Sequence, residues 1–301
     1  MRINPVLQKD LKTKLRGWRA PVLITCYIIL LALLLLVIFA GNGMLNPYNV
    51  YGYNPRLAVD TYNILIVFQF ALLFIAVPAI TATSISGERE RQTLDLMLVT
   101  KTHPRTIITG KVIISIAHTM LLFISSLPVL GVVFFFGGVG IADIAKLLLF
   151  YVFTAFFVAS SGVFFSSLFR RNITAIITTY LFLGLVTFGP FFAYLVHLYF
   201  RETAAIAAAT TYTPTYGEIL AILFPSPVFG FASFFFSDSS DYYGFNLWGR
   251  VVYYIDGYLN QQTGIMRLMK PWIVNGVFSI LASVLLIIAS TAVLNPLKRN
   301  K

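Results

Sequence analysis

Long runs of apolar residues alternate with short polar segments along this chain, and the runs have the length of membrane spans. About 20 residues of α-helix rise about 30 Å, which is the thickness of the hydrocarbon core of a bilayer. No sustained stretch has the period-two alternation or the mixed charge of a soluble domain. The pattern predicts an all-α polytopic membrane protein that forms a single domain. The six predicted transmembrane helices cover residues 21–40, 62–83, 111–136, 144–169, 173–199 and 272–294.

Two of these spans carry residues that affect helix packing. Span 144–169 has a stripe of small residues that suits close contact with another helix. Span 173–199 contains Gly189 and Pro190, so we expect its outer half to bend or break. The small residues of span 144–169 are Ser160, Ser161, Gly162, Ser166 and Ser167.

The longest segment without a predicted span is residues 200–271. Its part 217–236 is apolar, but Pro225 and Pro227 interrupt it. A seventh span here would move the basic C-terminus to the outer side. We therefore expect a re-entrant or interfacial pair of helices on the outer side, which is acceptable only where protein covers the open backbone. Residues 237–262 are rich in aspartate, serine and tyrosine and are expected to form an exposed outer cap.

Composition and charge support the membrane class. The 301 residues are 58% hydrophobic and 16% aromatic, with a mean hydropathy of +0.83 and a net charge of +11. With both termini inside, the cytoplasmic segments hold 16 lysines and arginines against four acids, and the outer segments hold six against seven. Lysine and arginine favour cytoplasmic loops, so this distribution explains the basicity without a nucleic-acid partner. It predicts a multi-pass protein of the cytoplasmic membrane, embedded in lipid, with both termini cytoplasmic.

The densest charge lies between the second and third spans, in residues 86–100. Ser86 is a suitable N-cap, and Arg91 with Asp95 has the spacing of an ion pair on a helix. The spacing predicts a helix of about 13 residues that ends near His103 and Pro104. Three apolar side chains share one face of this helix, and we expect that face to bind another protein. The candidate contact residues are Glu88, Arg89, Glu90, Arg91, Thr93, Leu94, Asp95, Met97 and Leu98.

The acids of this segment do not have the spacing of a catalytic or metal site. Glu88 and Glu90 diverge by about 200° around a helix, and Glu88 and Asp95 lie roughly 10 Å apart along it. The sequence contains no His-Glu-x-x-His, Gly-x-Ser-x-Gly or Gly-x-x-x-x-Gly-Lys-Ser/Thr pattern. We expect no catalytic residue, no metal and no nucleotide bound by this chain. A solvated charged loop remains an alternative for the segment.

The string from Ser86 to Thr100, with Gly110 and Lys111 ten residues later, resembles the cytoplasmic segment of ABC-2 type transporter permeases. The opening Asn4-Pro5-Val6-Leu7-x-Lys9-Asp10-Leu11 resembles the N-terminus of the same family. One departure is the sequence from Lys101 to Pro104, where that family more often has a Thr-Pro-Leu-like turn.

This resemblance implies a transmembrane subunit of an ATP-binding cassette (ABC) exporter. Two separate ABC ATPase subunits would bind ATP and Mg²⁺, and a second permease subunit, identical or homologous, would complete the transporter. Residues 88–100 would form the coupling helix that docks in a groove of the ATPase. Residues 4–19, which read as a basic amphipathic helix, would lie along the inner membrane face. The apolar residues of the coupling helix would then set affinity and the charges would set register.

The translocation pathway is less well specified. We expect Phe68, Gln69, Phe70 and Phe188 to lie near it, and an aromatic lining favours amphipathic or lipid-like cargo. Two other classes stay open, namely a membrane-embedded enzyme that modifies lipids and a channel or structural protein. Neither class would depend on the charged segment to contact an ATPase.

Overall fold

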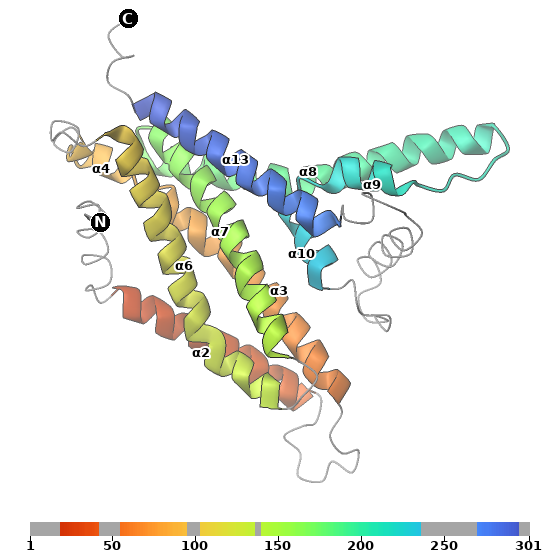
Figure 1. The fold of residues 1–301 in the computed structure, drawn as a ribbon, viewed down its shortest axis with the longest axis horizontal. Coiled ribbons are helices and arrows are strands. Elements are labelled where there is room, and N and C mark those ends of the chain that lie inside the picture. Colours follow the sequence, from red (N-terminus) through yellow and green to blue (C-terminus); the bar gives the residue numbers. More distant parts are fainter. Residues whose placement is uncertain (1–18, 42–54, 95–102, 136–139, 236–269, 295–301) are drawn as a thin grey trace, which may run out of the picture. The chain divides into compact units, whose positions relative to one another are not determined.

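A computed structural model of the 301-residue chain describes residues 19–41, 55–94, 103–135, 140–235 and 270–294. Within these residues every regular element is an α-helix (Figure 1). The long helices are α2 (Arg19–Gly41), α3 (Pro55–Thr81), α6 (Pro104–Phe135), α7 (Ile141–Leu168), α8 (Asn172–Ala207) and α13 (Pro271–Leu294). The short helices are α4 (Ser86–Glu90), α9 (Tyr216–Leu223) and α10 (Pro227–Phe235).

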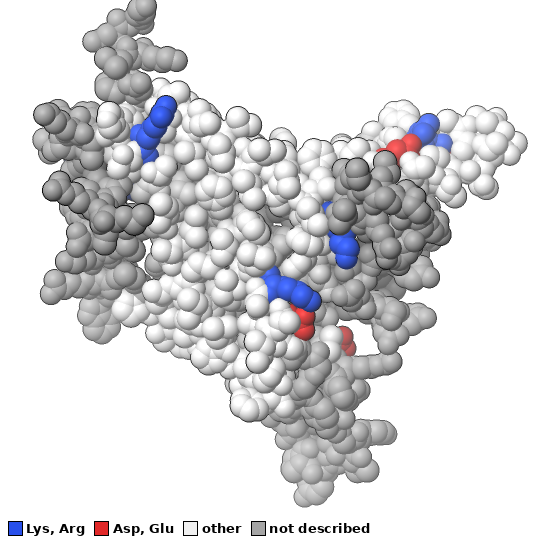
Figure 2. Space-filling view, in the orientation of Figure 1, with Lys and Arg blue, Asp and Glu red and all other residues white. Residues whose placement is uncertain are grey.

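Six helices in the described part of the chain are long and apolar enough to cross a bilayer, and they correspond to the six predicted spans. The all-α polytopic class is therefore confirmed. Helix α8 has 36 residues and is continuous through Gly189 and Pro190, so the expected break does not occur there. Charged side chains are sparse on the face drawn in Figure 2, as expected of a surface in contact with lipid.

The chain groups into two compact units, residues 1–176 with 286–301, and residues 177–285. In the first unit α3, α6 and α7 pack against one another, and α2 packs on α6 and α3 (Figure 1). Helix α7 is the most buried of the candidate spans. Its small residues explain this, because all five are buried and allow neighbouring backbones to approach closely. The predicted role of the stripe in close packing is confirmed.

Gly162 shows how tight this contact is. A Cβ atom at Gly162 would overlap the side chain of Thr81, at the end of α3, and would approach the backbone nitrogen of Ala82 to 3.2 Å. Thr81 is fully buried and donates its hydroxyl hydrogen to Val77 O at 2.9 Å. The absence of a side chain at Gly162 thus fixes the distance between α7 and the carboxyl end of α3.

The second unit contains α9 and α10, which form two short helices where the sequence predicts a helical pair. Their buried core consists of Tyr216, Ile219, Leu220, Leu223 and Phe229, with Phe191, Tyr194 and Val274 packed against it. The expected outer cap, residues 237–262, lies outside the described part of the chain. Pro227 is the first residue of α10, a position where a missing N–H group costs nothing.

Buried hydrogen bonds hold the turn between α9 and α10. Asn275 Nδ2 of α13 donates to Phe224 O at 2.8 Å and to Ser226 O at 3.0 Å. Ser226 Oγ donates to Thr187 O of α8 at 2.8 Å. Asn275 is thus a donor to Phe224 O and a second donor to Ser226 O, which also accepts from Gly230 N at 3.1 Å. Satisfied backbone groups are the condition for placing such a turn inside a membrane protein.

A polar cluster joins the end of α8 to the start of α9. Glu218 accepts hydrogen bonds from Arg201 at 2.8 Å, from Tyr212 Oη at 2.6 Å and from Thr215 N at 3.1 Å. The hydrogen bond from Tyr212, followed by those from Arg201 and from Thr215, lowers the pKa of Glu218 to about 2. Glu218 is therefore ionised at neutral pH and anchors the first turn of α9.

Candidate functional site

The charged segment forms a bent connection between α3 and α6, and its described part, residues 82–94, is called the elbow below. Helix α4 ends at Glu90, and Gln92 has a φ of 58°, which a right-handed helix cannot contain. Thr93 donates both its backbone N–H and its hydroxyl to Glu88 O. The predicted continuous helix of about 13 residues is therefore wrong, because the chain turns left-handed after one and a half turns.

Ser86 also differs from the prediction. The N-cap of α4 is Ile85, and Ser86 lies within the helix. Its hydroxyl is 2.6 Å from Asn172 Oδ1 of α8 and 2.9 Å from Ala82 O. Ser166 Oγ of α7 accepts the free backbone N–H groups of Ile85 and Ser86, both at 2.9 Å. A side chain of another span thus takes the place of a local cap.

Glu88 of the elbow forms an ion pair with Lys111 of α6. Lys111 Nζ lies 2.5 Å from Glu88 Oε1, and the two side chains are 6% and 21% exposed. In so dry a setting an ammonium group is retained only beside a negative charge. Lys111 was expected to open the third span at the membrane boundary, whereas it lies seven residues inside α6 and is buried.

Arg89 reaches the carboxyl end of α7. Its guanidinium donates to Ser167 O at 3.0 Å and to Phe169 O at 3.4 Å. The last carbonyl groups of a helix have no partner within the helix and carry partial negative charge. A cation is therefore stabilised here, and the contact ties the elbow to the end of α7.

Glu90 reaches the amino end of α8. Its two carboxylate oxygens accept from Asn172 N at 2.8 Å and from Asn172 Nδ2 at 2.6 Å. The first N–H groups of a helix are unsatisfied and favour an anion. Consecutive residues of α4 thus place a cation at the end of α7 and an anion at the start of α8.

These contacts form one arrangement, called the elbow clamp below. It consists of the interactions of Glu88 with Lys111, of Arg89 with the α7 carbonyl groups, and of Glu90 with Asn172. The sequence indicated which charged residues matter but not their partners, which lie far along the chain. The pairing of Lys111 with an acid could have been suspected from the basic position inside a span.

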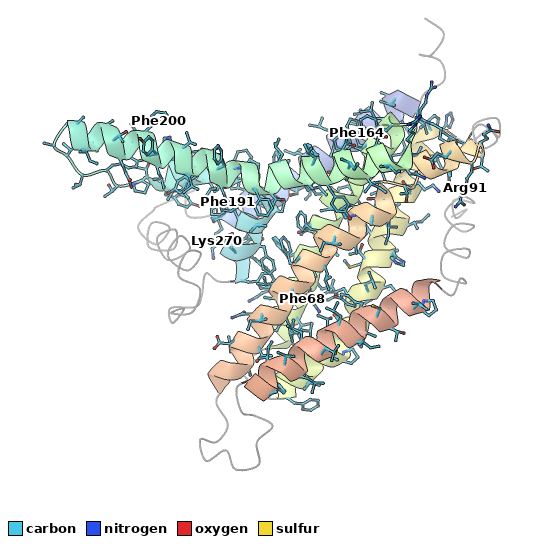
Figure 3. All side chains as sticks on the ribbon, turned by 180° about the vertical axis from the view of Figure 1, so that it is seen from behind. Phe68, Arg91, Phe164, Phe191, Phe200 and Lys270 are labelled. Atoms are coloured by element: carbon cyan, nitrogen blue, oxygen red, sulfur yellow. The ribbon has the colours of Figure 1, made fainter. Side chains whose placement is uncertain are left out.

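The remaining predicted contact residues divide into three groups. Arg91 and Thr93 are exposed, and Figure 3 labels Arg91 where α4 ends. Leu94 is only 4% exposed, so the chain itself covers this member of the expected apolar docking face. The assignment of Leu94 to an exposed docking face is therefore not supported by its burial. Asp95, Met97 and Leu98, and the expected amphipathic helix of residues 4–19, lie outside the described residues.

The four predicted pathway residues do not form one site within either unit. Gln69 and Phe70 are buried in the first unit, and Phe68, labelled in Figure 3, is half-buried on the same helix. Phe188 belongs to the second unit and is 69% exposed.

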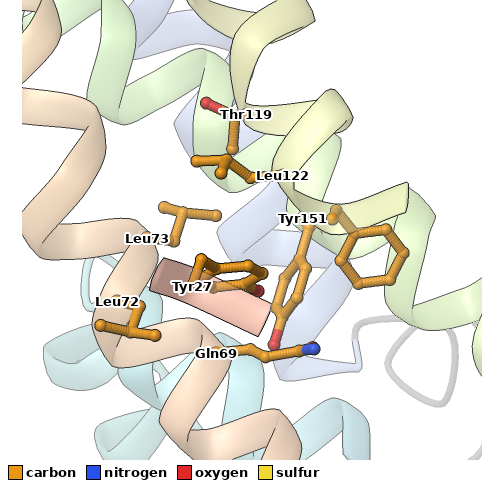
Figure 4. Close-up of a pocket in the computed structure, with 8 residues that line it drawn as sticks. Tyr27, Gln69, Leu72, Leu73, Thr119, Leu122 and Tyr151 are labelled. Atoms are coloured by element: carbon orange, nitrogen blue, oxygen red, sulfur yellow. The ribbon is translucent and has the colours of Figure 1, made fainter. Parts of the chain in front are cut away.

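Gln69 borders a small cavity of about 30 Å³ among α2, α3, α6 and α7 (Figure 4). Its Nε2 donates to Ser126 Oγ at 2.8 Å, while its buried Oε1 has no hydrogen-bond partner among the described residues. Tyr151 donates its hydroxyl hydrogen to Ile66 O at 2.7 Å. The volume is enough for a water molecule, which would satisfy Oε1. The other lining residues are Tyr27, Leu72, Leu73, Thr119, Leu122 and Phe123.

In the described residues no group of three histidine, cysteine, aspartate or glutamate side chains is arranged to hold a metal ion. The acids of the elbow are engaged in positioning helices, as the contacts above show. The geometry is that of a mechanical junction between spans.

Comparison with known proteins agrees with this geometry. No curated protein matches the chain. A family model described as ABC-2 type transporter matches residues 3–206, which include α2, α3, the elbow, α6 and α7. The match covers more than half of the 301 residues. With its six candidate spans, the chain belongs to the ABC-2 type transporter family and is a multi-pass membrane component of a transporter.

Proposed function

We propose that this chain is the permease subunit of an ABC exporter in the cytoplasmic membrane, with both termini on the cytoplasmic side. Two ABC ATPase subunits bind ATP and Mg²⁺, and a second permease subunit, identical or homologous, completes the transporter. Members of this family typically work with ABC ATPases. The cargo is amphipathic or lipid-like, in keeping with the aromatic and apolar composition of the spans.

The elbow clamp is the observation that carries this proposal. A coupling element must pass the motion of a soluble partner to the membrane spans. The chain itself joins the elbow to α3 and α6, and the clamp adds α7 through Arg89 and α8 through Glu90. Four spans therefore move with one short helix.

The strength of these contacts suits the transfer of force. Removing one partner of a buried ion pair costs about 3–5 kcal/mol, whereas an exposed pair contributes about 0–1 kcal/mol. The pair of Glu88 and Lys111 is mostly buried and belongs nearer the first class. ATP-driven closure of the ATPase subunits would displace the elbow, and the clamp would carry the displacement into α6, α7 and α8.

The elbow also has residues left for the partner. Arg91, Gln92 and Thr93 are exposed at its turn and take no part in the clamp. We assign the ATPase contact to this turn and to residues 95–100 that follow it. The charges of the clamp position the elbow, and the exposed turn binds the ATPase.

The test is co-expression of the tagged permease with the ABC ATPase encoded beside it. We expect the two to purify together and ATP turnover of the ATPase to change when the permease is present in proteoliposomes. A matched preparation contains the same ATPase without the permease. Failure to associate, together with identical turnover in both preparations, would contradict the proposal.

A further inference from the structure

The small cavity beside Gln69 lies inside the first unit, among four membrane-spanning helices (Figure 4). Tyr27 comes from α2, Gln69 from α3, Thr119 from α6 and Tyr151 from α7, and each belongs to a candidate span. None of the described residues that line the cavity carries a charge. A polar cavity at this depth needs an explanation, because a buried polar atom without a hydrogen-bond partner is costly.

Ser126 of α6 determines how the amide of Gln69 is oriented. Its one hydroxyl hydrogen goes to Phe123 O at 2.7 Å, so Ser126 Oγ can only accept further hydrogen bonds. It accepts from Gln69 Nε2 at 2.8 Å, and by the same reasoning the Tyr27 hydroxyl, its other hydrogen-bond partner, is a donor. Gln69 Oε1 is therefore the amide atom left without a partner among the described residues, although Gln69 is only 2% exposed.

The other hydroxyl groups of the cavity have no hydrogen to offer to Gln69 Oε1. Thr119 donates to Ser115 O at 2.9 Å, and Tyr151 donates to Ile66 O at 2.7 Å. A hydroxyl group has one hydrogen but two lone pairs, so both oxygens can still accept. Within the described residues the polar atoms of the cavity thus offer only acceptors, and a ligand that fits it must be a hydrogen-bond donor.

We propose that this cavity is a binding site for one water molecule, which donates one hydrogen to Gln69 Oε1 and the other to a hydroxyl oxygen of the lining. The cavity volume of about 30 Å³ exceeds the roughly 10–15 Å³ that a water molecule requires. Mg²⁺ and Ca²⁺ take six or more oxygen ligands and favour carboxylates, which the described lining does not contain. Water combines two hydrogens with a small volume and no charge.

The water completes a polar layer between α2 and the other helices of the first unit. Of the four spans around the cavity, α2 is the least buried. Its Tyr27 binds the Ser126 hydroxyl, which also holds Gln69 of α3. A hydrogen bond mediated by water is nearly as favourable as a direct one, and polar contacts between spans strengthen their association. The bound water therefore contributes to holding α2 on the bundle.

Radiolytic footprinting of the purified protein in lipid nanodiscs tests for the water directly. X-rays split bound water into hydroxyl radicals, which label the side chains in contact with it. We expect Phe123 to be labelled faster than Phe157 by about threefold or more, although both are at most 3% exposed. Phe157 is the matched control, because it is a buried phenylalanine that does not line the cavity. Labelling of Phe123 no faster than that of Phe157 would overturn the proposal.

The variant Gln69→Leu distinguishes a water site from a dry cavity by the sign of its effect on stability. In a dry cavity Oε1 is an unsatisfied acceptor, so its removal leaves the midpoint of thermal unfolding unchanged or raises it. With water bound, the substitution breaks satisfied hydrogen bonds, and the midpoint should fall by about 3 °C or more. A midpoint equal to or above that of the wild type would contradict the proposal. If the variant does not fold, the labelling of the wild type decides.

The same variant should lose the radiolytic signal. We expect labelling of Phe123 to fall about threefold in Gln69→Leu, because the water loses its acceptor. The control is Thr154→Val, which also replaces a buried polar group, on α7 and away from the cavity. It should leave labelling of Phe123 unchanged. A loss of the same size in both variants would show that the signal does not depend on Gln69, and the proposal would fail.

Discussion

Replacing Lys111 by methionine should destabilise the protein by leaving the Glu88 carboxylate without its ion-pair partner. Lys111 is 6% exposed and Glu88 is 21% exposed, and Glu88 Oε2 has no hydrogen-bond partner among the described residues. Breaking a fully buried pair costs about 3–5 kcal/mol, and partial exposure of the carboxylate reduces this to about 2–3 kcal/mol. The apparent midpoint of thermal unfolding in detergent should fall by about 5 °C.

The chain offers a matched control. Lys146 pairs with Asp143 at 3.3 Å, and both side chains are well exposed, 56% and 42%. An exposed pair contributes about 0–1 kcal/mol, so Lys146→Met should lower the midpoint by no more than about 2 °C. The same substitution thus breaks a mostly buried ion pair in one variant and a solvent-exposed ion pair in the other.

A second variant distinguishes the unpaired charge from lost packing. Adding Glu88→Gln to Lys111→Met removes the uncompensated carboxylate and should restore most of the midpoint. Equal midpoints for Lys111→Met and Lys146→Met would refute the reasoning. A double variant whose midpoint falls by the sum of the decreases of the two single variants would also refute it.

Three further predictions concern packing and the second unit. Gly162→Ala should destabilise by about 1–3 kcal/mol because its Cβ overlaps Thr81, while Gly131→Ala, with open space around it, should be neutral or slightly stabilising in thermal unfolding. The pKa of Glu218 falls from 4.5 to about 2, mainly through its hydrogen bond with the Tyr212 hydroxyl. Glu218 therefore contributes stability that is present above pH 4.5 and is lost as the pH falls through about 2. Hydrogen-exchange protection of the first turn of α9, corrected for intrinsic rates, should decline over this range, and Glu218→Gln should remove the decline. Asn275→Leu removes the Asn275 donor from Phe224 O and one of the two donors from Ser226 O, and it should make a cysteine placed at Ser226 react faster with a thiol reagent than in the Asn275 background.

Hydropathy was sufficient to predict the number, order and class of the long helices. A bilayer allows only closed hydrogen-bonding patterns, so an apolar run of about 20 residues is almost always a helix. The ends were predicted less well, because helices continue into water where the apolar run stops. Helix α3 starts at Pro55 rather than near residue 62, and α8 continues to Ala207 rather than ending near residue 199. Pro104 was expected to end the coupling helix, whereas it is the first residue of α6.

The elbow shows what the sequence could not provide. Helix spacing in residues 86–100 favoured one continuous helix, but Gln92 adopts a positive φ that glycine or asparagine would ordinarily mark. The turn is held by Thr93, whose two bonds to Glu88 O satisfy the backbone there. Leu94 was assigned to a docking face on helical periodicity alone, and the break at Gln92 interrupts that periodicity before Leu94.

The partners of the elbow acids depend on contacts between distant segments. Glu88 meets a lysine 23 residues away, and Glu90 meets an asparagine 82 residues away. Local rules favour both acids near the start of the helix predicted here, where they stabilise the helix dipole. The structure instead uses Glu90 for the dipole of another helix, α8, which no single-sequence rule predicts.

The central claim is that the elbow clamp couples the ATPase to the spans, and Glu90→Ala tests it most directly. The variant removes the link to Asn172 while Arg91, Gln92 and Thr93 remain available for docking. ATP turnover of the bound ATPase should be measured in proteoliposomes at saturating ATPase, with the Kd for the ATPase measured in parallel. The account predicts that the Kd is unchanged. It also predicts that the variant alters ATP turnover of the ATPase far less than the wild-type permease does. A turnover equal to that of the wild-type complex would contradict it.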